Sequence, residues 1–153
     1  MDLQKEVHFW LKRALDEPIV KILLKNSNLT KIQLETLLID VLADNYSGKS
    51  LKYSEKASLR LIKSKISRGS FQRTLVQAKQ NAIKGVYTIL LLGYLGIFEG
   101  TSLDPYLEVA NKLNTYIEAY TEVQNTKTET QESLKIIEML KKELETSLNL
   151  LSK

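Results

Sequence analysis

Apolar residues recur at spacings of three and four positions along nearly the whole of this 153-residue chain. Only two prolines and six glycines interrupt the pattern, and no stretch alternates apolar and polar residues with β-branched enrichment. Because a period of about 3.6 residues places apolar side chains on one face of an α-helix, the pattern predicts an all-α protein. We therefore expect a helical bundle of five to seven helices.

Polar, proline-containing and capping residues divide the periodic pattern into separate helices. The expected helices begin near Asp2, Pro18, Thr30, Ser54, Ser67 and Asp104. The fourth of these is expected to be short and to end near Ile62. Thr30 and Gln33 have the spacing of a capping box. The polar residues 125–130 are either a loop before a further helix or a solvated part of one long helix.

The composition excludes several classes of protein. Without cysteine there is no disulfide framework, thiolate chemistry or sulfur-ligated metal site, and His8 is the only histidine. The N-terminus carries charges of both signs and lacks the pattern of a secretion signal. The longest apolar run, residues 86–98, is shorter than the roughly 20 residues of a membrane span. We expect a cytoplasmic, non-enzymatic protein with no metal, no cofactor and no membrane partner.

Positive charge is concentrated in the middle third of the chain. Residues 46–98 hold ten Lys or Arg and one acid, Glu55, so ten minus one gives a local net charge of +9. Residues 1–45 sum to −1 and residues 99–153 to −4. Solvated helix surfaces usually mix the two signs. The block therefore predicts a polyanionic partner, with the alternative that its bases are only the solvated faces of two helices.

Residues 66–78 lie inside this basic block. Ser67 is placed to cap a helix, and Phe71 and Leu75 are spaced to anchor it on the body of the protein. The segment resembles the second half, the turn and recognition helix, of many bacterial and archaeal helix-turn-helix regulators. That resemblance implies a helix-turn-helix-like central unit that binds DNA rather than RNA. It places four side chains at the nucleic acid: Arg68, Ser70, Gln72 and Arg73.

The preceding residues depart from the helix-turn-helix pattern. Leu61, Ser64 and Lys65 stand where those regulators commonly have a small residue, an apolar residue and a glycine. A looser prediction is that all ten bases of the block, Lys56 and Arg60 included, form one contiguous phosphate-binding surface. Such a surface needs no insertion of a helix into a groove, so it is compatible with this departure. Tyr46 and Tyr53 either stack on unpaired bases or pack within the protein. The full predicted nucleic-acid-binding set is Lys49, Lys52, Lys63, Lys65, Arg68, Ser70, Gln72, Arg73 and Gln77.

The long helix that follows Ser67 is apolar over its second half. Its side chains either form the centre of the core or contact a second subunit, and we expect a homodimer or a protein partner. The residues concerned are Val86, Tyr87, Leu90, Leu91, Tyr94 and Leu95.

Two domains are expected: residues 1–100 as a helical core that contains the basic unit, and residues 101–153 as an acidic helical arm that packs on the core or dimerises. The leading hypothesis is a nucleic-acid-binding protein, specifically a DNA-binding transcriptional regulator acting through a basic helical face. The alternative is an all-helical interaction or scaffold subunit of a larger protein or nucleoprotein complex.

Overall fold

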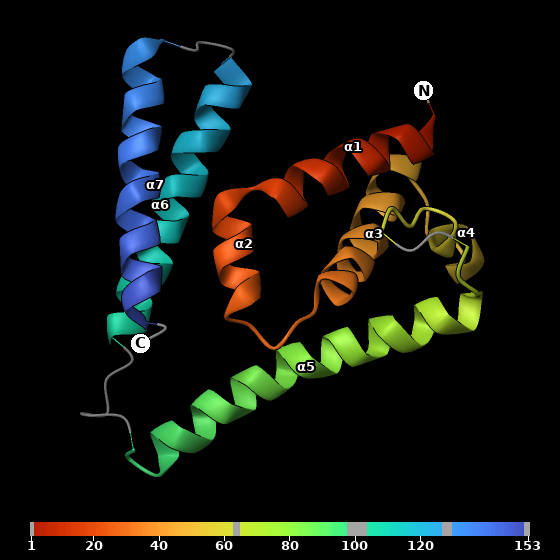
Figure 1. Ribbon diagram of the computed structural model, residues 1–153, viewed down its shortest axis with the longest axis horizontal. Coiled ribbons are helices and arrows are strands. Elements are labelled where there is room, and N and C mark those ends of the chain that lie inside the picture. Colours follow the sequence, from red (N-terminus) through yellow and green to blue (C-terminus); the bar gives the residue numbers. More distant parts are fainter. Residues whose placement is uncertain (1, 63–64, 98–103, 127–129, 152–153) are drawn as a thin grey trace. The chain divides into compact units, whose positions relative to one another are not determined.

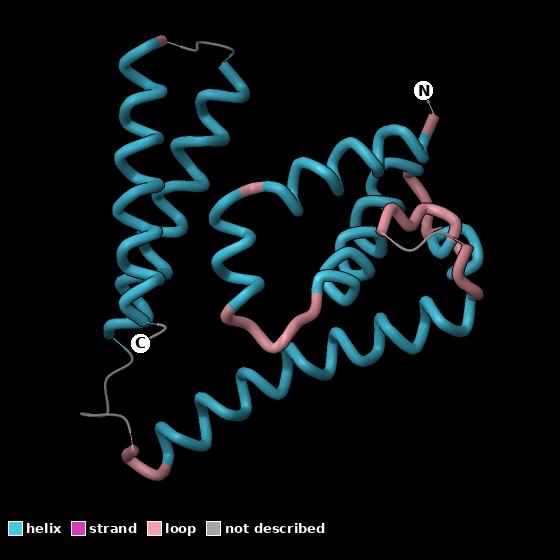
Figure 2. Tube along the Cα trace, in the orientation of Figure 1, coloured by secondary structure: helices cyan, strands magenta, loops and turns pink. Residues whose placement is uncertain are grey.

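The computed structural model describes residues 2–62, 65–97, 104–126 and 130–151, and these residues form seven α-helices and no strand (Figures 1 and 2). The all-α prediction is confirmed. None of the described helices is long and apolar enough to cross a membrane. The helices are α1 (Leu3–Asp16), α2 (Pro18–Lys25), α3 (Lys31–Ser47), α4 (Tyr53–Ala57), α5 (Arg68–Tyr94), α6 (Asp104–Thr126) and α7 (Gln131–Leu151).

The chain divides into two compact units, Met1–Leu91 and Leu92–Lys153, and the boundary falls in the last turn of α5. The boundary expected between residues 100 and 101 lies outside the described residues. The first unit contains α1 to α4 and most of α5. The second contains α6 and α7.

Side-chain caps set the beginnings of the first helices. The Asp2 carboxylate accepts the Gln4 N–H at 3.1 Å, and the Glu17 carboxylate accepts the Val20 N–H at 2.8 Å. The capping box predicted before α3 is confirmed, because Thr30 Oγ1 accepts the Gln33 N–H and Gln33 Oε1 accepts the Thr30 N–H. These bonds satisfy N–H groups that have no partner within the helix.

The fourth helix ends earlier than the sequence predicts, at Ala57 rather than near Ile62. Side chains from other helices occupy the backbone groups that would continue it. The Glu35 carboxylate of α3 accepts the N–H groups of both Leu61 and Ile62. His8 of α1 donates its Nε2–H to the Leu59 carbonyl at 2.9 Å. Tertiary hydrogen bonds therefore replace helical ones in this segment.

The core of the first unit lies among α1, α3 and the first half of α5. Their fully buried or nearly fully buried apolar side chains form one cluster with residues of the segment between α3 and α5. Asn81 of α5 also donates to the Asn28 carbonyl at 3.1 Å, which fixes the middle of α5 to the loop before α3. The buried cluster consists of Val7, Leu11, Ile39, Ala43, Leu51, Ala57, Leu59, Phe71 and Leu75.

The second unit is an antiparallel pair of helices. Val109 of α6 is buried together with Leu144 and Leu148 of α7. Lys112 Nζ of α6 lies 3.0 Å from Ser147 Oγ and 3.5 Å from Glu143 Oε1 of α7. Since Asp104–Thr126 and Gln131–Leu151 run in opposite directions, they are two helices joined by a short connection, not one long helix.

Candidate nucleic-acid interface

The basic block of the sequence does not form one continuous exposed surface. Lys56 is only 3% exposed, and its ammonium lies 2.7 Å from Asp40 Oδ1 and 2.8 Å from Asp44 Oδ2. Both carboxylates belong to α3, outside the basic segment of the chain. The expectation that Lys56 faces a polyanion is therefore wrong, because two acids that precede the block in sequence pair with it in space.

Arg60 is the second base of the block that is buried, again 3% exposed. Its guanidinium donates to Thr36 Oγ1 at 2.6 Å, lies 3.6 Å from Glu35 Oε2 and covers the ring of Phe71. Glu35 is completely buried and also accepts the two N–H groups that follow Arg60. Arg60 is therefore a structural cation, and its predicted place on a phosphate-binding surface is also wrong.

Ion pairing changes the acidity of the groups around Lys56. The pKa of the Asp44 carboxyl is lowered most by the hydrogen bond from Lys56 and next by the hydrogen bond from the Leu51 N–H. Burial acts to lower the pKa of the Lys56 ammonium, but the hydrogen bonds to Asp40 and Asp44 outweigh it and raise that pKa overall. Burial, opposed by Glu35, lowers the pKa of Arg60.

These shifts predict how stability depends on pH. Since the folded-state pKa of Asp44 is lowered, its contribution to stability is complete above the ordinary carboxyl pKa of about 3.9 and is lost as the pH falls through the lowered value. We expect Lys56→Met to weaken this acid dependence, measured as the urea midpoint between pH 2 and pH 6. Lys52→Met is the matched control, because Lys52 is exposed and forms no ion pair with the residues that the structure describes. Identical pH profiles for the two variants would contradict the conclusion that Lys56 lowers the pKa of Asp44.

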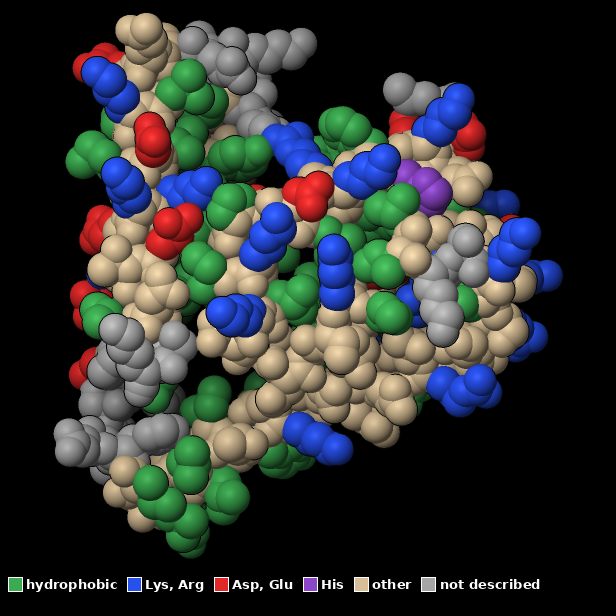
Figure 3. Space-filling view, in the orientation of Figure 1, with side chains coloured by type: hydrophobic (Ala, Val, Ile, Leu, Met, Phe, Trp, Pro, Cys, Tyr) green, Lys and Arg blue, Asp and Glu red, His purple; other side chains and the backbone are tan. Residues whose placement is uncertain are grey.

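Six other bases of the block are exposed. Among the residues that the structure describes, none of these six side chains forms an ion pair. Lys79 is half-exposed and lies 3.6 Å from Asp40 Oδ2, and Lys63 lies outside the described residues. Figure 3 shows Lys and Arg side chains gathered over α4 and the first turns of α5. The six exposed bases are Lys49, Lys52, Lys65, Arg68, Arg73 and Lys84.

The first half of α5 has the two faces that the sequence predicts. Ser67 caps the helix by accepting the Ser70 N–H at 3.1 Å, and Phe71 and Leu75 are buried. Ser70 is half-buried. The other predicted contact residues of this helix are exposed: Arg68, Gln72, Arg73 and Gln77.

A shallow groove of about 420 Å³ runs along the exposed face of α5. Gly69 opens its N-terminal end: a Cβ at this position would lie 3.5 Å from Arg73 Nη1, so the Arg73 guanidinium rests beside the glycine. The groove therefore presents a guanidinium and two amide side chains, Gln72 and Gln77, outward from a helix that is anchored on its opposite side.

The segment before α5 has one feature of a tight turn. Lys65 has φ = 61°, in the left-handed region that glycine favours, at the position where helix-turn-helix regulators often have glycine. The helix before it, α4, has only five residues, and residues 58–67 separate it from α5. The helix-turn-helix arrangement remains a prediction.

The two tyrosines of the predicted surface pack within the protein. The Tyr53 ring lies 6.3 Å from the ring of Phe71, and the Tyr46 ring is stacked on Trp10 of α1 at 6.5 Å. Of the two alternatives for these side chains, the contacts favour packing over stacking on bases.

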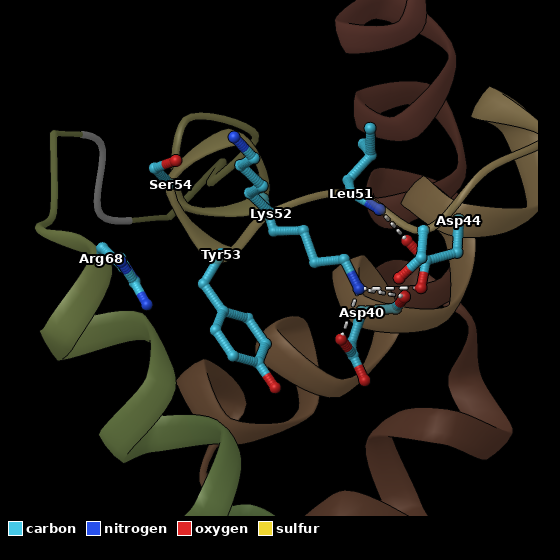
Figure 4. A pocket seen from close by; sticks show the side chains of 9 residues that line it. Asp40, Asp44, Leu51, Lys52, Tyr53, Ser54 and Arg68 are labelled. Carbon is cyan, nitrogen blue, oxygen red and sulfur yellow. Dashed lines mark hydrogen bonds and ion pairs between the residues drawn. The ribbon is translucent and has the colours of Figure 1, made fainter.

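A cleft of about 640 Å³ lies between α3, α4 and the first turn of α5 (Figure 4). Figure 4 shows Lys52, Ser54 and Arg68 toward one side of it, Asp40 and Asp44 toward the other, and the Tyr53 ring between. Its lining comes from three separate segments, and no spacing in the sequence predicts that they meet. The remaining lining residues are Ser50, Leu51 and Lys56.

No protein family, curated protein or solved structure that was compared with the chain matched it. Among the described residues, no three His, Cys, Asp or Glu side chains are grouped so that they could hold a metal ion. The function is therefore inferred from the arrangement of the side chains themselves.

Proposed function

We propose that this protein binds nucleic acid, DNA in preference to RNA, through the exposed basic face formed by residues 49–52, Lys65 and residues 68–84 of α5. The observation that supports the proposal is the set of six exposed bases without acidic partners among the described residues. A DNA-binding transcriptional regulator is the role that corresponds to such a face.

The chemistry of this face suits a phosphate backbone. Lys and Arg side chains neutralise phosphates and release condensed counterions, which gives affinity without sequence preference. Arg73 and Gln77 also point away from the body of the protein, and Arg and Gln side chains can form paired hydrogen bonds with guanine and adenine edges. Phe71 and Leu75 hold this helix rigidly on the core.

Fluorescence anisotropy with duplex DNA, single-stranded DNA and RNA of the same sequence tests the proposal. We expect duplex DNA to bind most tightly and Arg68→Ala/Arg73→Ala to weaken that binding at least tenfold, since hydrogen bonds to charged groups contribute about 1.5–3 kcal/mol each. Lys12→Ala/Lys21→Ala is the control, because it removes the same charge from exposed positions of α1 and α2. No binding at low salt, or equal loss in the two variants, would refute the proposal.

The distal half of α5 favours a second function, that of an interaction subunit. Val86, Tyr87, Leu90 and Leu91 are 57–68% exposed, so they do not belong to the core of the first unit. Residues 85–97 contain no charged side chain. A second copy of the chain fits this surface, because an uncharged apolar patch is complementary to itself across a two-fold axis. We propose a homodimer formed through it.

Sedimentation velocity tests the dimer. Burying one leucine side chain contributes about 1.5–3 kcal/mol, so Leu90→Glu should raise the dimer dissociation constant at least tenfold. Val41→Glu on α3 replaces an apolar side chain that is 59% exposed, similar to Leu90, and should leave the dimer intact. The sedimentation is run at about 100-fold the protein concentration of the anisotropy titration, in the roughly micromolar to sub-millimolar range. If the wild-type protein is still monomeric there, the dimer is excluded.

A further inference from the structure

The cleft between α3, α4 and α5 concentrates hydrogen-bond donors. Two of the six exposed bases, Lys52 and Arg68, line it together with the hydroxyl-bearing side chains of Ser50, Tyr53 and Ser54. Its volume of about 640 Å³ is within the range of pockets that hold small ligands or single nucleotide units. Donors of this kind bind oxyanions.

The two carboxylates in the same cleft do not make it anionic. Asp40 and Asp44 are both ion-paired with Lys56, and the second oxygen of Asp44 accepts the Leu51 N–H at 2.8 Å. The second oxygen of Asp40 lies 3.6 Å from Lys79 Nζ. Two acids are thus set against the three bases that line the cleft, which leaves the charges of Lys52 and Arg68 only partly balanced.

The cleft and the groove on α5 are lined by residues that are adjacent in the chain. Arg68 lines the cleft, and the next residue along α5, Gly69, lines the groove that holds Arg73. A strand that follows the groove toward the N-terminus of α5 therefore reaches the cleft. A base-paired stretch in the middle of a duplex is too wide to enter this cleft, whereas the terminal group of one strand can do so.

We infer that this cleft binds a terminal phosphate monoester of a nucleic-acid strand. A terminal monoester carries close to two negative charges and three free oxygens, whereas an internal diester carries one charge. Lys52 and Arg68 match the additional charge, and the hydroxyls of Ser50 and Ser54 supply donors for the additional oxygen. The inference rests on the proposed function and identifies the part of the nucleic acid that this site selects.

Three oligonucleotides of one sequence test it: one with a 5′-phosphate, one with a 3′-phosphate and one with hydroxyls at both ends. We expect one phosphorylated form to bind about tenfold more tightly than the hydroxyl form, since a charge-assisted hydrogen bond contributes about that factor. Lys52→Ala should remove the preference. Lys84→Ala, an exposed position of α5 outside the cleft, should weaken all three equally and keep the preference.

Equal affinity for the three oligonucleotides would overturn the inference, as would a preference that survives in Lys52→Ala. Competition with inorganic phosphate separates the two sources of a monoester. The terminal phosphate adds a measurable free energy to strand binding. If inorganic phosphate alone binds the protein with that same free energy, the cleft holds free phosphate and the strand-end assignment is wrong. Salt-dependent binding of the hydroxyl-ended oligonucleotide would still support the basic face, so the two proposals fail separately.

Discussion

Replacing Glu35 with glutamine should lower the free energy of unfolding by about 3 kcal/mol, the typical cost of leaving one member of a buried ion pair without its partner. The side chain is completely buried beside Arg60, which is itself 3% exposed. Glutamine keeps an oxygen that can accept the N–H groups of Leu61 and Ile62, as Glu35 does. The variant therefore isolates the loss of the charge from the loss of the backbone hydrogen bonds.

A double-mutant cycle gives the prediction its strongest test. Arg60→Met should also be costly, because it leaves the Glu35 carboxylate buried without its cation. Glu35→Gln/Arg60→Met removes both charges and should recover part of the lost stability, so the two effects should not add. Urea denaturation followed by circular dichroism at pH 7 measures each variant.

Asp16→Asn serves as the control for loss of a carboxylate, because Asp16 is exposed at the end of α1 and should change stability by no more than about 0.5 kcal/mol. Additive effects of Glu35→Gln and Arg60→Met would show that the two charges do not depend on each other.

Duplex DNA affinity should fall about a thousandfold between 50 and 200 mM monovalent salt, because six phosphate contacts give a slope of about −5 in a plot of log K against log salt. The six exposed bases of the proposed face set this number of contacts. If Lys56 and Arg60 also contacted phosphates, the slope would be steeper by about 2. The salt slope therefore measures how many bases of the block the fold leaves available.

Variants should change this slope according to their position. Arg68→Ala/Arg73→Ala should reduce its magnitude by about 1.8, since each lost contact contributes about 0.9. Lys12→Ala/Lys21→Ala should leave it unchanged, because these bases lie on α1 and α2. A slope near zero for the wild type would rule out phosphate binding by this face.

Several features of the fold and the candidate site were predictable because they depend on residues close together in the chain. The capping box of Thr30 and Gln33, the cap at Ser67 and the inward positions of Phe71 and Leu75 all involve separations of three or four residues. At that distance the geometry of the helix itself determines which groups meet.

The contacts that define the site involve much larger separations. Glu35 and Arg60 are 25 positions apart, and Asp40 and Lys56 are 16 apart. A count of charges along the chain treats these acids as lying outside the basic block, although they neutralise two of its members. The early end of α4 has the same origin, because the Glu35 carboxylate accepts N–H groups that a longer helix would use.

Helical periodicity, a shortage of breakers and local caps were thus enough to establish an all-α protein and the two faces of the first half of α5. The packing of α3 against the segment before α5 determines which lysines and arginines reach solvent. The physical reason is that secondary structure follows from interactions within one turn, whereas the burial and pairing of a charge depend on the side chains that another helix brings beside it.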